Sequence, residues 1–223
     1  MVNLEFPESA EKMAYLPVQY LEIGVFYLIF FFKLLYPFRL SNSPWQHVAA
    51  AAGGCILIKS SILTEIGGFG SIKKCLIDDC ALAGKIKNNG GRIWIGLTHS
   101  AISLRRYEHL QAIWDMVART AFIQLRFSYS LLVLCTFLML AAFALPPVSL
   151  FLPDIPSKIL GVFTLAIMFG CYLPTLKYYA IHPLWGFGLP VTGMLYLAMT
   201  WSSVHRYIFR TGARWKDRHY KPV

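Results

Sequence analysis

Two adjacent carboxylates, Asp78 and Asp79, stand directly before a predicted helix over residues 80–88. A carboxylate in such a place can serve as a general base and take the proton of an attacking hydroxyl group. It can also simply cap the helix, because aspartate side chains accept hydrogen bonds from the first backbone N–H groups of a helix. On its own, the pair leaves both roles open.

The elements that must position this pair are short and are separated by glycines. The sequence predicts a turn at Gly53-Gly54, a short buried strand over 55–58, and a helix over 61–66. A second strand is predicted over 92–97, after the glycines that end the helix of the aspartate pair. In sequence, the aspartate pair therefore falls between the two predicted strands.

Two further helices are predicted in the first 130 residues. An amphipathic helix over 107–128 has its apolar residues on one face at helical spacing. The aromatic run that ends near Phe38 predicts a helix at about 20–38, lying at the membrane interface, with the Lys33 stem extending to water. A core helix of a soluble domain is the alternative for that run.

Composition points to a membrane protein. Hydrophobic residues make up 57% of the chain and charged residues only 14%, yet the formal net charge is +10. A basic, apolar chain is suited to anionic lipid at the cytoplasmic face. Nucleic acid is not expected as a partner, because the basic residues flank hydrophobic segments instead of lining one soluble face.

Three hydrophobic segments are long enough to cross a bilayer, at about 130–152, 158–178 and 183–204, and they define a membrane region over 129–205. The tail at 206–223 is strongly basic and therefore reads as cytoplasmic. Three crossings would place the tail opposite the N-terminal part. Either one segment is re-entrant or the tail departs from the charge rule.

The order and spacing of the motifs resemble the second half of family 2 glycosyltransferases, most closely the bacterial hopene-associated enzymes. The resemblance is carried by Ala52-Gly53-Gly54, Gly67-Gly68-Phe69, Asp78-Asp79-Cys80-Ala81-Leu82-Ala83, Gly91-Arg92-Ile93-Trp94, Gln124-Leu125-Arg126 and Gly212-Ala213-Arg214-Trp215-Lys216.

This resemblance implies an α/β fold: a partial GT-A (Rossmann-like) domain over 1–128, followed by an α-helical transmembrane bundle. It implies a membrane-bound enzyme that transfers a sugar from a nucleotide-sugar donor to a lipid acceptor, with its catalytic face in the cytoplasm. By the same resemblance Asp79 is the general base and Asp78 lies beside it. Gly53 and Gly54 lie where the backbone approaches the sugars.

Four further residues are implied to bind substrate. Arg126 matches the arginine of the family's (Gln/Arg)-x-x-Arg-Trp motif, with Gln124 beside it, whereas Phe127 replaces the tryptophan. Trp215 and Lys216 belong to the tail motif, whose alternative reading is a basic, lipid-facing anchor.

The resemblance also implies a divalent cation, Mg or Mn, held by an Asp-x-Asp motif, but the sequence contains no such motif. The ligands are therefore not expected in this chain, which we interpret as the C-terminal part of a longer protein. The five cysteines form no Cys-x-x-Cys pair and predict no metal site. A non-catalytic membrane scaffold is the alternative function. A transporter is disfavoured, because the hydrophobic segments have no ionisable residue at their centres.

Overall fold

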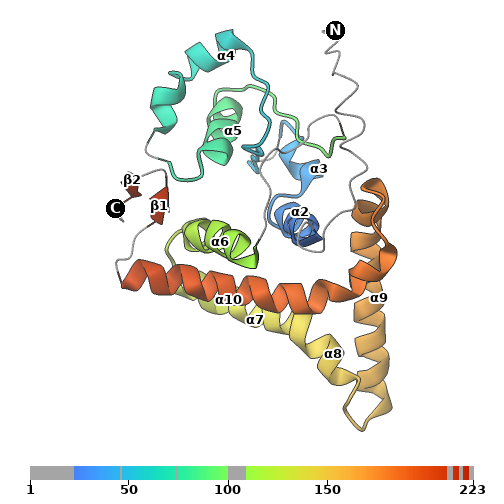
Figure 1. Cartoon of the computed structure of the whole chain (residues 1–223). Coiled ribbons are helices and arrows are strands. Elements are labelled where there is room, and N and C mark those ends of the chain that lie inside the picture. The colour runs from blue at the N-terminus through green and yellow to red at the C-terminus, as the bar shows by residue number, and fades with distance from the viewer. Residues whose placement is uncertain are drawn as a thin grey trace.

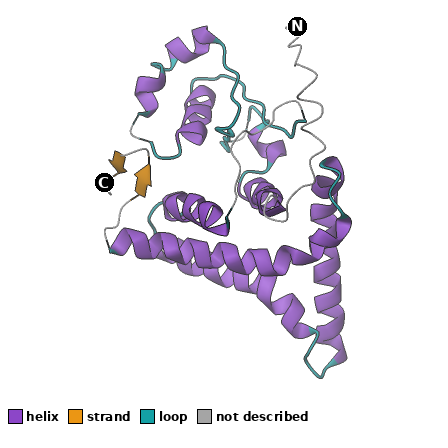
Figure 2. Ribbon diagram, in the orientation of Figure 1, coloured by secondary structure: helices purple, strands orange, loops and turns teal. Residues whose placement is uncertain are grey.

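The computed structural model describes residues 23–45, 47–73, 75–99, 109–209, 213–215 and 218–220. Almost all regular structure in these residues is helical (Figures 1 and 2). The exception is a short antiparallel pair, β1 (Ala213–Trp215) and β2 (Arg218–Tyr220), in which Arg214 lies opposite His219.

The expected α/β fold is therefore wrong: across the described residues the chain is all-helical, apart from that one pair in the tail. Residues 55–58 and 92–97, both predicted as strands, are extended but belong to no strand. Nor is the predicted pattern of burial present, because Leu57 is fully exposed at 100% and Trp94 is 78% exposed.

A side chain takes the place of a partner strand beside residues 92–97. The Asn42 amide accepts a hydrogen bond from the Ile95 backbone N–H at 2.7 Å and donates one to the Ile95 carbonyl at 2.9 Å. A backbone needs both kinds of bond when it is buried. One asparagine supplies them at Ile95 without any ladder, so the segment is extended without forming a sheet.

The segment that carries the aspartate pair is a small helical layer. It contains α4 (Ser60–Glu65), η1 (Phe69–Ile72) and α5 (Asp78–Asn88), joined around a core of Ile66, Ile72, Leu82 and Ile86. Consecutive glycines after α4, Gly67 and Gly68, have φ angles of 85° and 63°, which residues with a side chain rarely adopt. They turn the chain back, so that η1 can pack on α5.

The sequence predicted two helical segments next to this layer, and one of them contains two helices. α2 (Ile23–Leu35) and the short α3 (Phe38–Ser41) occupy the aromatic run, and α6 (Leu110–Gln124) occupies the amphipathic segment. Figure 1 shows α2 and α6 between the α4–α5 layer and the long C-terminal helices.

The long C-terminal helices form a hairpin. Its first arm consists of α7 (Tyr129–Met139), a π-helical turn η2 (Leu140–Ala144) and α8 (Leu145–Ser149); its second arm is α9 (Ile155–Tyr178). Pro146 and Pro147 explain the π turn. Proline has no backbone N–H to donate to a carbonyl of the preceding turn, and its ring pushes that carbonyl away, so the helix widens there. Both arms are long and apolar enough to cross a membrane.

Close packing between the arms depends on Gly161. A Cβ at this position would overlap the Ser149 side chain and lie 2.8 Å from the Pro146 carbonyl oxygen. Small residues allow such close approach of membrane helices.

The third predicted span is organised differently from the other two. Residues 183–188 form the 3₁₀ helix η3 (Pro183–Gly188), and α10 (Leu189–Ile208) follows it directly. α10 is not among the helices whose composition is apolar enough for a crossing. Its last two turns explain this, since they include Ser202, Ser203, His205 and Arg206.

Candidate functional site

The Asp79 carboxylate is fixed by two backbone N–H groups. Its Oδ2 accepts a hydrogen bond from Gly53 N at 2.9 Å, and its Oδ1 accepts one from Cys80 N at 2.7 Å. The side chain is half-buried, whereas that of Asp78 is exposed and accepts a bond from Asp79 N at 3.0 Å. The two carboxylates therefore have different surroundings, and among the described residues only Asp79 is linked to a residue distant in sequence.

Neither aspartate caps α5, contrary to the prediction from the sequence. α5 begins at Asp78 itself, and the residue at its N-cap position is Ile77. Neither aspartate occupies the cap, so the prediction that one of them caps a helix starting at residue 80 is wrong. The Asp79 side chain instead joins the first turn of α5 to the glycine turn.

Gly53 allows this contact, and Gly54 does not take part in it. A Cβ on Gly53 would lie 3.2 Å from Asp79 Oδ2, which is closer than an ordinary contact. A Cβ on Gly54 would meet no atom within 4 Å. The structure therefore brings Gly53 to the predicted base and leaves Gly54 exposed in the turn.

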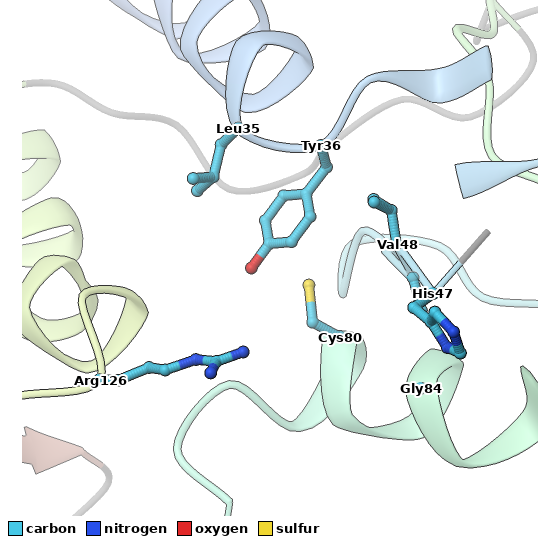
Figure 3. Close-up of a pocket in the computed structure, with 8 residues that line it drawn as sticks. Leu35, Tyr36, His47, Val48, Cys80, Gly84 and Arg126 are labelled. Carbon is cyan, nitrogen blue, oxygen red and sulfur yellow. The ribbon is translucent and has the colours of Figure 1, made fainter. Parts of the chain in front are cut away.

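A shallow, open pocket of about 470 Å³ lies next to the aspartate, against Cys80 (Figure 3). It is formed by the end of α2, the loop after α3, one face of α5 and the turn after α6. Its lining residues are Leu35, Tyr36, His47, Val48, Ala49, Cys80, Gly84 and Arg126. Asp79 is not itself a lining residue. It stands beside the pocket, next to Cys80 and near enough to Tyr36 for its charge to raise the pKa of that hydroxyl.

Three polar side chains meet in this pocket. Figure 3 shows the Tyr36 hydroxyl and the Arg126 guanidinium both directed toward the Cys80 sulfur. Burial raises the pKa of the Tyr36 hydroxyl, and the neighbouring Cys80 thiol and the Asp79 charge raise it further. Burial likewise raises the pKa of the Cys80 thiol. At neutral pH both groups are therefore protonated and can donate hydrogen bonds.

An unusual backbone conformation follows α6 and includes Arg126. Arg126 and Phe127 have φ angles of 51° and 56°, in the left-handed region that residues with a side chain rarely occupy. The turn is held by hydrogen bonds from Arg126 N to the Ile123 carbonyl at 2.8 Å and from Phe127 N to the Phe122 carbonyl at 3.0 Å. This turn ends α6 at the pocket, where the Arg126 side chain enters it.

The remaining predicted residues lie away from the pocket. Gln124 is exposed at the last position of α6 and does not line it. The backbone of Trp215 pairs with that of Arg218 in the tail, but its side chain lies outside the described part of the structure, as does the whole of Lys216. The structure thus joins Asp79 with Gly53 and adds Arg126 nearby.

Sequence reasoning missed Tyr36 and Cys80 as pocket residues. Both belong to motifs that it singled out: Tyr36 to the aromatic run, and Cys80 to the segment that follows the aspartates. Their polar groups meet only because the end of α2 lies against α5, which neither motif indicates by itself.

The described residues do not provide a metal site. No group of three or more histidine, cysteine, aspartate or glutamate side chains in this part of the chain could hold a metal ion. Asp78 and Asp79 are two carboxylates without a third ligand, and the second already accepts two backbone hydrogen bonds. The described residues therefore supply no complete set of protein ligands for a divalent cation, and no step is assigned to one.

Comparisons with protein-family models, with curated proteins and with solved structures gave no match to this chain.

Proposed function

We propose that the chain is the acceptor-side part of a membrane-bound family 2 glycosyltransferase, which transfers a sugar from a nucleotide-sugar donor to a lipid acceptor. The observation that carries this proposal is the Asp79 carboxylate, held by two backbone N–H groups, beside a pocket that its neighbour Cys80 lines together with the ends of α2 and α6. The sequence resemblance adds the reaction class, with a hopanoid or related isoprenoid lipid as acceptor.

In this reaction Asp79 is the general base. It takes the proton of the acceptor hydroxyl while that oxygen bonds to the anomeric carbon of the sugar. The bond from that carbon to the donor phosphate breaks, and the nucleoside diphosphate leaves with the electron pair. The hydrogen bonds from Gly53 and Cys80 hold the carboxylate in one orientation. The base is therefore already oriented before the acceptor binds, which lowers the entropic cost of reaching the transition state.

The pocket suits an acceptor that comes from the membrane. Leu35, Val48 and Ala49 give it an apolar wall, and Leu35 is the last residue of α2. α2 packs on α9, one of the two helices apolar enough to cross a bilayer. A lipid whose chain remains among these helices can therefore present its polar end to Asp79 beside the pocket.

The polar groups of the pocket then have distinct roles. Arg126 provides a positive charge for a phosphate or another anionic group of the substrates. Tyr36, which stays protonated, can donate a hydrogen bond to the acceptor oxygen. Neither residue is assigned as a base.

A non-catalytic membrane scaffold is the second candidate. It is favoured by one observation: neither the sequence nor the described residues supply the ligands expected for a divalent cation. The two candidates differ in whether the native protein transfers sugar.

The experiment that separates them starts from the native protein. It is captured from source membranes with an antibody against residues 206–223 and sized on a denaturing gel. It is then incubated with its own lipid extract, Mg²⁺ or Mn²⁺, and each of a panel of radiolabelled nucleotide sugars. Label in the lipid phase supports the enzyme. A native band at 25.3 kDa together with no transfer from any donor contradicts it and favours the scaffold.

A further inference from the structure

We infer that Lys87 is a positioning residue for the lipid acceptor: it holds in place the segment that forms one wall of the pocket. That segment, the strap, comprises residues 48–53 and connects the loop after α3 to the glycine turn. The inference rests on the proposed function, because that function assigns the pocket to the acceptor.

The strap has no regular structure of its own. Over residues 48–52 the chain forms neither helix nor strand. Ala50, in the middle of the strap, is nevertheless only 2% exposed. A buried segment without regular structure needs hydrogen-bond partners elsewhere for its backbone groups. For the strap, α5 supplies them.

The start of α5 fastens one end of the strap. The Cys80 thiol lies 3.8 Å from the Ala51 carbonyl oxygen and is a weak donor to it. The hydrogen bond from Gly53 N to the Asp79 carboxylate, 2.9 Å long, belongs to the same end. This end keeps the proposed base oriented, and none of its bonds involves Lys87.

The last turn of α5 fastens the other end through Lys87. Its Nζ donates a hydrogen bond to the Val48 carbonyl at 2.6 Å and a longer one to the Leu40 carbonyl at 3.5 Å. Leu40 belongs to α3, and Val48 follows the loop after that helix. One charged donor therefore joins both sides of the loop to α5. Hydrogen bonds from a charged donor are stronger than those between neutral groups.

The pocket lies between the two fastened ends. Val48 lines it from the strap, and Gly84 lines it from the middle of α5 (Figure 3). A Cβ on Gly84 would meet no atom within 4 Å, so the space beside this turn is open. Release of Val48 from Lys87 would widen this space and remove an apolar wall from the acceptor. Lys87 does not line the pocket, so it acts on the acceptor through the strap.

Lys87→Met in the native-length protein tests this inference, because methionine keeps most of the side-chain length and removes the donor. Lys87→Arg is the conservative variant, which keeps a charged donor. Lys85→Met is the matched control, since Lys85 lies in the same last turn of α5 and, in the described structure, its side chain makes no hydrogen bond to the strap.

The first readout is the kinetics of transfer by the detergent-solubilised protein. Initial rates are measured while the lipid extract of the source membranes is titrated as acceptor. Loss of a hydrogen bond from a charged donor favours the released strap by about 10- to 100-fold, and apparent affinity falls with the fraction of molecules that hold it. We expect Lys87→Met to raise the acceptor KM about threefold or more. Because Gly53 stays bonded to Asp79, kcat should change less than about twofold.

The second readout needs no activity. Cys80 lines the pocket, whereas Cys55 is exposed and serves as a reference in the same molecule. The rates at which N-ethylmaleimide modifies the two thiols are measured by peptide mass spectrometry. We expect the Cys80-to-Cys55 ratio to rise about threefold or more in Lys87→Met, as the strap is released. Lys87→Arg and Lys85→Met should leave both readouts within about twofold of the unmodified protein.

An unchanged acceptor KM in Lys87→Met would overturn the inference, and so would an equal rise in Lys85→Met. If the unmodified protein transfers no sugar, the proposed function fails; the alkylation ratio then decides whether Lys87 holds the strap, and an unchanged ratio overturns that as well. Should Lys87→Met not accumulate in membranes, Lys87→Gln is measured in its place with the same expectation.

Discussion

Replacing Gly53 by alanine tests the contact between the glycine turn and the Asp79 carboxylate, the proposed general base. The new methyl group would lie 3.2 Å from Asp79 Oδ2, so the carboxylate or the turn must shift by a few tenths of an ångström. The hydrogen bond from Gly53 N, now 2.9 Å long, would lengthen or break. The perturbation thus acts on the orientation of Asp79 and leaves its chemistry intact.

The size of the effect follows from the bond at risk. A hydrogen bond to a charged group contributes about 1.5–3 kcal/mol. One factor of ten in rate corresponds to about 1.4 kcal/mol, so complete loss of the bond in the transition state would slow transfer roughly 10- to 100-fold. Because the same bond links the glycine turn to α5 in the folded protein, we expect the free energy of unfolding to fall by no more than about 1.5–3 kcal/mol.

Gly54→Ala provides the matched control. It adds the same methyl group one residue later, where no atom lies within 4 Å. The assay is the initial rate of sugar transfer to lipid by the native-length protein in membranes, normalised to protein amount by blotting. We expect Gly53→Ala to slow transfer about tenfold or more and Gly54→Ala to change it less than about twofold. Equal rates for the two variants would refute the reasoning.

Three further predictions concern the packing and the pocket. Phe122 is only 1% exposed and packs between α6, α7 and α10, so Phe122→Ala would leave a cavity there. We expect this change to lower the free energy of unfolding by about 3–5 kcal/mol in denaturant titrations. An unchanged free energy of unfolding would contradict the packing. The side chains of Asp115 and Arg206 are 49% and 34% exposed, so water screens their ion pair. We therefore expect a double-mutant cycle on the two residues, measured by thermal unfolding, to give a coupling free energy below about 1 kcal/mol. A coupling of several kcal/mol would mean that the pair is desolvated. Burial raises the pKa of the Cys80 thiol, so in single-cysteine variants we expect Cys80 to be alkylated more slowly at pH 8 than the exposed Cys55, and faster reaction at Cys80 would show an accessible thiolate.

Local periodicity predicted the helices and failed for the strands. A helix closes its hydrogen bonds within its own segment, so spacing of apolar residues sufficed for the helices at 107–128 and 80–88. A strand needs a partner that the segment itself does not specify. Ile58 and Ile93 do pack against the small core beside α5, which is why their segments looked like strands. Within the described part of the chain, their backbones nevertheless pair with no neighbouring strand.

The third predicted span shows a related difficulty. Hydrophobic composition at 183–204 is compatible with a crossing, but residues 202 to 206 of α10 are bonded to α6, far away in sequence. Such contacts depend on the tertiary arrangement. For the same reason the sequence singled out Asp79 and Gly53 but not the meeting of Tyr36 with Cys80, since these two residues come from separate motifs.

The central claim is that Asp79 is the base, and Asp79→Asn tests it most directly. Asparagine preserves the size of the side chain and one acceptor oxygen, but it cannot take a proton from the acceptor hydroxyl. Asp78→Asn is the control, since that exposed carboxylate bonds only to the adjacent backbone N–H in the described structure. We expect Asp79→Asn to slow lipid glycosylation by about 100-fold or more and Asp78→Asn by less than about tenfold, in membranes with equal protein. Transfer by Asp79→Asn at the unmodified rate would contradict the account.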